Sequence, residues 1–125
     1  MQLDEYFKRG KVYVWKELFV ICKSRHTHPK AFANIVDKDE ITVIIDENYL
    51  HDLDVIDVQK GWKIFTLDIV FPMDVCGVTA KIASALAQKG ISIMPLAAFS
   101  RDHFLIRNKD VQEAKRVFES LGLSL

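Results

Sequence analysis

A short loop between a strand-like and a helix-like segment holds the residues whose types and spacing could bind a ligand. Asp74 and Gly77 lie in the run DVCGV, residues 74–78. A helix that begins here would present unpaired backbone N–H groups and the positive end of its dipole, which favour a carboxylate. Gly77 would let that carboxylate approach the backbone closely; Asp74 could instead accept an α-ammonium group. The alternative is that Asp74 caps the helix and Gly77 only turns the chain.

The segments on either side of this loop have the periods of a strand and of a helix. The apolar residues before it alternate with polar ones, as in a half-buried strand that stops at a proline: Phe65, Leu67, Ile69 and Phe71. The apolar residues after it form one helical stripe: Val78, Ile82, Ala85 and Leu86. Gly90 predicts the end of this helix, with Ile91 packed back onto its last turn.

The C-terminal part predicts two strands and a second helix. Residues 91–99 are strand-like but contain Pro95, which cannot donate to a sheet ladder and therefore indicates an edge strand or a bulge. Residues 104–107 should form a short returning strand. The next helix should begin at Asp110, with Glu113 placed to complete a capping box.

The N-terminal half predicts strands and little helix. Residues 11–22 are rich in valine and aromatic residues, which favours extended structure. Residues 31–36 and 41–46 have the composition of two hairpin strands joined by an acidic turn. Residues 47–53 should form a short helix, with Asp46 as its cap.

Together the two halves predict an α+β fold. The order strand, helix, strand, strand, helix in the second half is that of a ferredoxin-like sandwich, in which an antiparallel sheet carries its helices on one face. Residues 54–60 are the candidate linker. We therefore expect residues 1–61 to repeat the sheet part of this unit in degenerate form, and residues 62–125 to form the complete domain.

Composition limits the classes of partner. A chain of 125 residues, half of them hydrophobic, can hold one ordinary domain or two very small ones with a shared core. Lys plus Arg and Asp plus Glu are both 17, and this zero net charge argues against a general electrostatic grip on nucleic acid or anionic lipid. No apolar run reaches the roughly 18 residues of a membrane span, and the polar N-terminus does not resemble a secretory signal. We expect a cytoplasmic protein with neither nucleic-acid nor membrane partners.

Few residues suggest catalysis or metal binding. His26 and His28 form an HxH pair in a predicted loop, but no Cys or carboxylate is spaced to complete a metal site, so solvated histidines are the favoured interpretation. Cys22 and Cys76 lack CxxC spacing and should be reduced thiols. The serines lack a glycine elbow, and no phosphate loop or dinucleotide fingerprint occurs. We expect no enzyme activity, no metal and no cofactor.

Landmarks in both halves resemble a known family. The loop, the helical stripe and the segment after it resemble the signature of the ACT domain: Asp74 to Val78, Ile82, Leu86 and residues 90–93. Further landmarks resemble the small tandem-ACT proteins related to aspartokinase regulatory and arginine-sensor domains: residues 38–43, Gly61, Trp62 and residues 102–107. The resemblance covers roughly residues 11–125, and it implies an ACT sandwich built of two ACT-like halves.

The resemblance also implies a function. ACT domains are regulators that bind amino acids and pair through their sheets, so the expected protein is a non-catalytic, allosteric ACT module that binds an amino acid or similar metabolite. It should form a homodimer or larger homo-oligomer, with the site at a subunit or inter-half interface. The implied ligand-binding residues are Asp74, Val75, Cys76, Gly77, Val78 and Asp102. For Asp102, a turn-forming role is the alternative to gripping a cationic group.

A second interpretation starts from the strand after the glycine helix. Relatives tend to carry small hydroxyl residues there, whereas this chain has Ala97 and Ala98, and Pro95 interrupts the strand. Fewer side-chain donors are then available to a ligand. The alternative is an ACT-like structural module without a ligand, which offers an edge strand to a partner enzyme or regulator.

Overall fold

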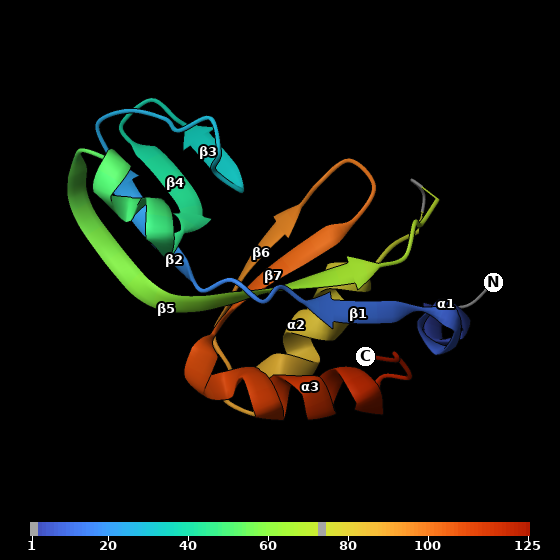
Figure 1. The fold of residues 1–125 in the computed structure, drawn as a ribbon. Helices are drawn as coiled ribbons and strands as arrows, with labels where there is room; N and C mark the ends of the chain where they lie inside the picture. Colours follow the sequence, from blue (N-terminus) through green and yellow to red (C-terminus); the bar gives the residue numbers. More distant parts are fainter. Residues whose placement is uncertain (1–2, 73–74) are drawn as a thin grey trace. The chain divides into compact units, whose positions relative to one another are not determined.

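The computed structural model describes residues 3–72 and 75–125, which form two compact units (Figure 1). One unit consists of residues Lys16–Trp62, and the other combines residues 3–15 with the described part of Lys63–Leu125. Strand β5, Val55–Asp68, runs from the first unit into the second. One limit between these units lies between Trp62 and Lys63, one residue after the expected division. Residues 3–15, however, pack with the C-terminal half.

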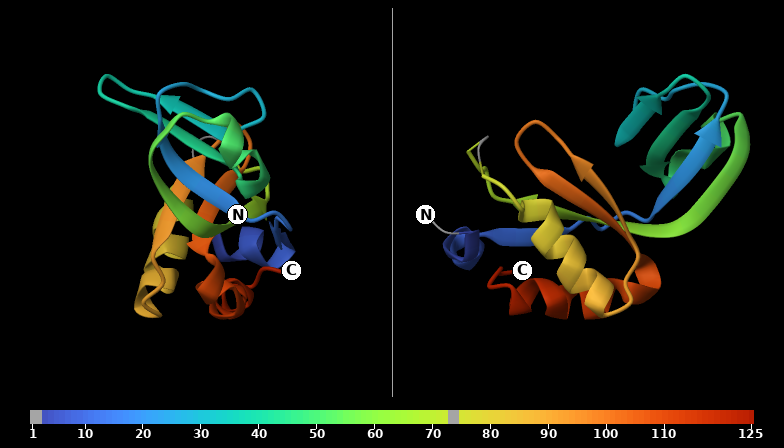
Figure 2. Two further views of the ribbon diagram at one scale, coloured as in Figure 1. Left: turned by 60° about the vertical axis from the view of Figure 1, so that its left-hand side comes forward. Right: turned by 180° about the vertical axis from the view of Figure 1, so that it is seen from behind.

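The unit that contains the C-terminus is an antiparallel sheet covered by helices. Its elements are α1 (Leu3–Arg9), β1 (Lys11–Val14), the end of β5, α2 (Val78–Gln88), β6 (Ile93–Ala97), β7 (Asp102–Arg107), the 3₁₀ helix η2 (Asn108–Asp110) and α3 (Val111–Ser120). Strands β1 and β7 both neighbour β5, and β6 pairs with β7. Figures 1 and 2 show α2 and α3 on the same face of these strands, as the sequence pattern predicts.

The core of this unit lies between the helices and the sheet. Apolar stripes of α2 and α3 meet the inward-facing strand residues in one cluster: Val78, Ile82, Leu86, Val111, Ala114, Val117, Phe118, Phe65, Leu67, Phe104 and Ile106. The Phe65 and Phe118 rings stack with centroids 5.3 Å apart. Full burial of side chains of this size contributes about 1.5–3 kcal/mol each, so the helical face and the alternating strand stabilise one another.

The glycine-terminated end of α2 follows the expected pattern. Gly90 has φ of +70°, and the Ile91 N–H donates to the Leu86 carbonyl at 3.1 Å. Ile91 itself is buried. This is the Schellman arrangement, which satisfies a carbonyl left free at the helix end.

Three expectations for this unit need correction. The strand before the loop ends at Asp68 and does not continue to Pro72. The capping box is absent, because Asp110 makes no side-chain cap bond and the Glu113 carboxylate instead accepts two hydrogen bonds from Arg116, one turn further on. Helix α1 is additional: its short polar sequence gives no apolar stripe, yet Phe7 within it is completely buried.

The other unit is a small antiparallel sheet with one 3₁₀ helix. Its elements are β2 (Phe19–Ser24), β3 (Ala33–Val36), β4 (Ile41–Asp46), η1 (Glu47–Asp52) and the beginning of β5, with the strands in the order β3-β4-β2-β5. The hairpin, the short helix and its cap confirm the prediction, since the Asp46 carboxylate accepts the Asn48 N–H at 2.9 Å. A small core of its own lies under η1: Val20, Cys22, Val43 and Ile45.

The predicted linker is wrong, because residues 55–60 belong to β5. They pair with β2, where Val58 lies opposite Cys22. The exposed polar residues of this stretch face away from that small core, and for this reason they resembled a linker in the sequence. Gly61, with φ of +83°, lies where the pairing shifts by one residue between Phe19 and Ile21, as at a β-bulge.

No helix among residues 3–72 and 75–125 is long and apolar enough to cross a membrane.

Candidate functional site

The predicted glycine loop forms part of a cavity of about 330 Å³ in the unit that contains the C-terminus. Its walls come from the loop, from the first turn of α2 and from the turn between β6 and β7. Four of the predicted site residues line it: Val75, Gly77, Val78 and Asp102. Cys76 is exposed and is not a wall residue. Asp74 lies outside the described residues.

The first turn of α2 brings residues with backbone donors to this cavity. Gly77 is the N-cap residue, with φ of +85° and no side-chain cap bond. The first helical hydrogen bond runs from the Lys81 N–H to the Gly77 carbonyl at 2.9 Å. The N–H groups of the three preceding residues, 78–80, therefore have no acceptor within the helix, and all three residues line the cavity. A carboxylate placed there could accept hydrogen bonds from these N–H groups and would also lie at the positive end of the helix dipole.

The opposite wall is the turn between β6 and β7. The Ala98 N–H donates to the Arg101 carbonyl at 3.0 Å, which places Phe99 and Ser100 at the tip of the turn. Phe99 is fully exposed and lines the cavity mouth. Asp102 begins β7, opposite Ala97.

Asp102 is the charged residue among the described residues that line the cavity. Burial raises the pKa of its carboxyl above the ordinary value, and the nearby His103 opposes that shift. The adjacent Arg101 does not neutralise Asp102, because its Nε donates to Asp68 at 2.7 Å. Among the described residues, no side chain forms a hydrogen bond or ion pair with the Asp102 carboxylate. A partly desolvated carboxylate of this kind gains from a cationic ligand group.

The sequence analysis predicted no role for His103, which follows Asp102 on β7. The Trp15 indole N–H donates to the Thr66 hydroxyl at 2.7 Å, and Thr66 Oγ1 lies 2.8 Å from His103 Nδ1. Since an indole N–H can only donate, the Thr66 hydrogen is free to point at Nδ1. Burial lowers the pKa of His103, so the neutral ring is favoured. Its partner Thr66 is 37 positions away in the sequence, and no local spacing marks the pair.

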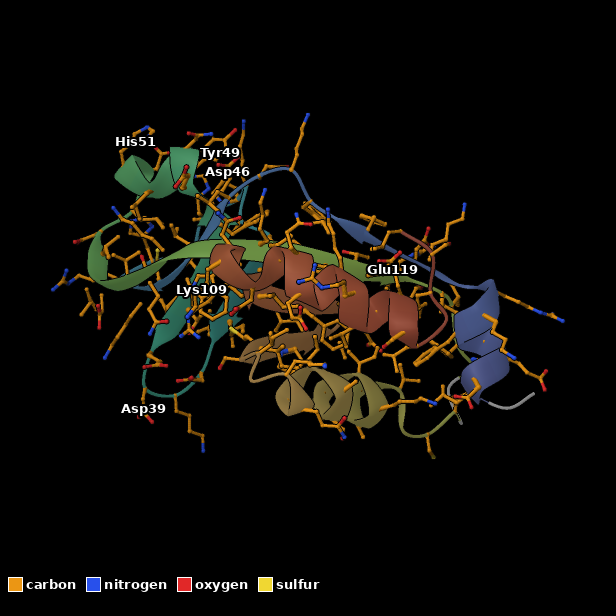
Figure 3. All side chains as sticks on the ribbon, turned by 90° about the horizontal axis from the view of Figure 1, so that it is seen from below. Asp39, Asp46, Tyr49, His51, Lys109 and Glu119 are labelled. Atoms are coloured by element: carbon orange, nitrogen blue, oxygen red, sulfur yellow. The ribbon has the colours of Figure 1, made fainter. Side chains whose placement is uncertain are left out.

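The HxH pair has a structural role in the other unit. His28 is 8% exposed, so the expectation of two solvated histidines is wrong for this residue. Its Nδ1 accepts the Lys30 N–H, and its Nε2 therefore donates to Asp52 Oδ2 at 3.0 Å. Figure 3 shows Tyr49 and His51 on η1, the element that also supplies Asp52. Within the described part of the chain, no cluster of His, Cys, Asp and Glu could hold a metal ion.

The same unit has a second cavity, of about 350 Å³, beside the hairpin of β3 and β4. Its wall includes the acidic turn, on which Figure 3 labels Asp39. The Asp37 carboxylate accepts the N–H groups of Asp39 and Glu40, both at 2.8 Å. These two bonds lower the pKa of Asp37.

Comparisons with known proteins add a family and a fold. The model of the ACT domain family matches residues 57–120. A solved Vibrio cholerae protein of unknown function is 17% identical with a TM-score of 0.78, over 96% of this chain and 95% of that one. An Agrobacterium tumefaciens protein is 22% identical with a TM-score of 0.79, over 93% and 91%.

The third comparison is with the ligand-free regulatory subunit of aspartate kinase from Thermus thermophilus. It is 14% identical with a TM-score of 0.63, over 90% of this chain and 96% of that one. At these identities the likeness shows a shared fold. No curated protein matches the sequence significantly.

Proposed function

The chain belongs to the ACT domain family, whose model covers residues 57–120, and from this premise we propose that it is a regulatory protein that binds a free amino acid. The observation that carries the proposal is that residues 78–80, whose N–H groups have no acceptor within α2, and the Asp102 carboxylate lie around one cavity. A free amino acid is the smallest common metabolite that carries an ammonium and a carboxylate on the same carbon. Each of its two charged groups has a complementary wall here.

In this arrangement the ligand carboxylate lies at the first turn of α2 and its ammonium at Asp102. The remaining wall includes Phe71, Val75 and Phe99, which offer apolar surface to the ligand side chain. Gly77, a lining residue, leaves free space beside the backbone, because a Cβ added there would meet no described heavy atom within 4 Å other than those of its chain neighbours. We keep Asp74 and Cys76, which belong to the same loop, as proposed ligand-binding residues.

The proposed role is regulatory and non-catalytic. Thr79 and Ser100 bring hydroxyl groups to the cavity, but the neighbouring imidazole nitrogen, His103 Nδ1, already faces Thr66. A nucleophile would need such a base within hydrogen-bond reach. The likeness in fold to an aspartate kinase regulatory subunit supports an allosteric role for this chain too. We further propose two ACT-like halves and a homodimer or larger homo-oligomer.

Isothermal titration with each of the common L-amino acids tests this function. We expect at least one to bind, with one ligand per cavity, and to raise Tm; a ligand at 100 times its Kd stabilises the folded state by about 2.7 kcal/mol. The amide of that amino acid, which lacks the carboxylate, and its N-acetyl form, which lacks the ammonium, should both bind more weakly. No heat and no stabilisation by any amino acid at millimolar concentration would refute the proposal and leave the fold intact.

One observation favours a second function, a ligand-free module that docks on a partner enzyme or regulator. Strand β6 ends the strand order of the sheet, and the turn that follows it exposes Phe99 completely. An open strand edge of this kind can pair with another chain. A partner captured in a pull-down, with an affinity that is indifferent to added amino acids, would favour this function over the first.

A further inference from the structure

We propose that helix α1 supports the ligand site, with Tyr6 and Asp4 as positioning residues that hold two of its three walls, the loop before α2 and the first turn of α2. This inference rests on the proposed function, because the cavity matters only if it binds a ligand. Helix α1 precedes the first cavity-lining residue, Phe71, by about half of the chain, and it lies outside the residues that the family model matches, 57–120.

The first wall is held through Phe71. This residue lines the cavity and lies beyond the end of β5, so the sheet ladder does not fix it. Its ring centroid is 5.2 Å from that of Tyr6, with the planes inclined by 52°. The Phe7 ring approaches Phe71 edge-on at 6.5 Å. Two rings of α1 therefore determine where this wall stands.

The second wall is held through Lys81. The Lys81 N–H closes the first turn of α2 on Gly77, directly after the three residues that line the cavity. Its ammonium forms an ion pair with Asp4 and lies 5.7 Å from the centroid of the Phe7 ring. Helix α1 thus contacts the turn whose N–H groups are proposed to bind the ligand carboxylate.

Helix α1 can act as a brace because it has an anchor of its own. Phe7 is completely buried in the core, and the Gly10 N–H donates to the Phe7 carbonyl at 3.1 Å. Tyr6 and Asp4 extend from this fixed point to the loop side and to the helix side of the cavity. The two walls are joined to each other by the short loop that contains Gly77. Docking of α1 and occupancy of the cavity are therefore linked, and the linkage is reciprocal.

The structural part of the inference is testable without a ligand, by amide hydrogen exchange in Tyr6→Ala and Asp4→Asn. The two reporters are Val75, whose N–H donates to Pro72, and Lys81, whose N–H donates to Gly77. A ring pair of this geometry corresponds to about a 2- to 10-fold change in an equilibrium. We expect exchange at both reporters to rise by that factor. The Ile91 N–H, bonded at the opposite end of α2, should not change.

Conservative and matched variants separate positioning from a general loss of stability. Tyr6→Phe keeps the ring and Asp4→Glu keeps the charge, so both should restore exchange close to the wild-type rate. Glu113→Gln removes an exposed ion pair, that with Arg116 on α3, and should leave both reporters unchanged. Phe7 is left intact in every variant because it belongs to the core. Unchanged exchange in Tyr6→Ala and Asp4→Asn would overturn the inference.

Titration of the same variants with the common L-amino acids tests the functional part. Each amino acid that binds the wild-type protein should bind Tyr6→Ala and Asp4→Asn about 2- to 10-fold more weakly, with recovery in Tyr6→Phe and Asp4→Glu. Faster exchange together with unchanged Kd would overturn the positioning role. If no amino acid binds the wild-type protein, the proposed function fails on that result. The exchange rates then decide separately whether α1 holds the walls.

Discussion

The two units of this protein each contain a cavity of similar size beside a strand connection, and they differ in what their polar groups already bind. The cavity near α2 measures about 330 Å³ and that near the β3–β4 hairpin about 350 Å³. Near the hairpin, Asp37 accepts two backbone N–H groups, and Lys23 lies 3.9 Å from Glu40. Near α2, the helix donors have no acceptor within the helix, and Arg101, next to Asp102, donates to Asp68 instead.

Asp37 and Asp102 show this difference, because their pKa values shift in opposite directions. Hydrogen bonds from Asp39 and Glu40 lower the pKa of Asp37, whereas burial raises that of Asp102. The first carboxylate is stabilised by the folded chain, and the second is made less stable by it. Cavity volume therefore does not identify a binding site here. The proposed site differs from the other cavity in that its helix donors have no acceptor within the helix and its carboxylate is partly desolvated.

The largest expected effect is on the glycine of the loop. Gly77→Val forces a β-branched residue to φ of +85°, and we expect at least a 100-fold loss of amino-acid affinity by titration, because the branched side chain enters the carboxylate position. Gly90→Val is the matched control. It has φ of +70°, equally free space for a Cβ, and a place at the far end of the same helix.

The two valine variants should lose similar stability, by about 1–2 kcal/mol, as left-handed backbone costs in a residue with a Cβ. Only Gly77→Val should lose binding. Equal affinities in the two variants would show that the loop does not contact the ligand, and would leave the two cavities without a functional difference.

An intermediate effect is expected for Asp102→Asn. Loss of a hydrogen bond to a charged group should weaken amino-acid binding by about 10- to 100-fold in titration at neutral pH. Because the folded-state pKa is raised, the ionised carboxylate costs stability above that pKa, and this cost disappears as pH falls through it. The ligand-free variant should therefore have a Tm equal to or higher than that of the wild type. The affinity of the wild-type protein should decrease as pH falls through the same pKa.

The smallest expected effect is for Asp37→Asn at the other cavity. An amide oxygen is a weaker acceptor than a carboxylate, so the turn loses support and Tm should fall by about 3 °C in thermal unfolding. The folded-state pKa of Asp37 is lowered, so its contribution to stability is present above the unfolded pKa and is lost as pH falls through the folded value. Amino-acid affinity should stay within about 2-fold. A Tm shift of the same sign in Asp37→Asn and Asp102→Asn would contradict the comparison.

Local patterns in the sequence were sufficient for α2 and its ends. Gly77, the stripe from Val78 to Leu86 and Gly90 all act within a few residues of one another, and their geometry follows the predicted order. Asp102 could be predicted as a candidate site residue because it matches a landmark of the family. What the sequence could not supply were contacts between distant segments.

Two errors show this limit in physical terms. Residues 55–60 looked like a linker because half of the strand faces solvent, and the partner that makes it a strand, β2, lies far earlier in the chain. His28 looked solvated because its carboxylate partner, Asp52, is 24 positions away. No pattern within residues 3–9 indicates a contact with Phe71, so the packing of α1 against the cavity wall could not be predicted from the sequence either.

The arrangement of the two units along the chain has a consequence for synthesis on the ribosome. Residues Lys16–Trp62 are contiguous, so all their strand partners are present as soon as this stretch has emerged. The other unit needs its first segment and its last, because the Val12 N–H donates to Ser124 and the Ser124 N–H donates to Gly10. These bonds of the N-terminal segment can therefore form only after Ser124 has been synthesised. Among the two units, the one that holds the proposed amino-acid site should therefore be the later to fold.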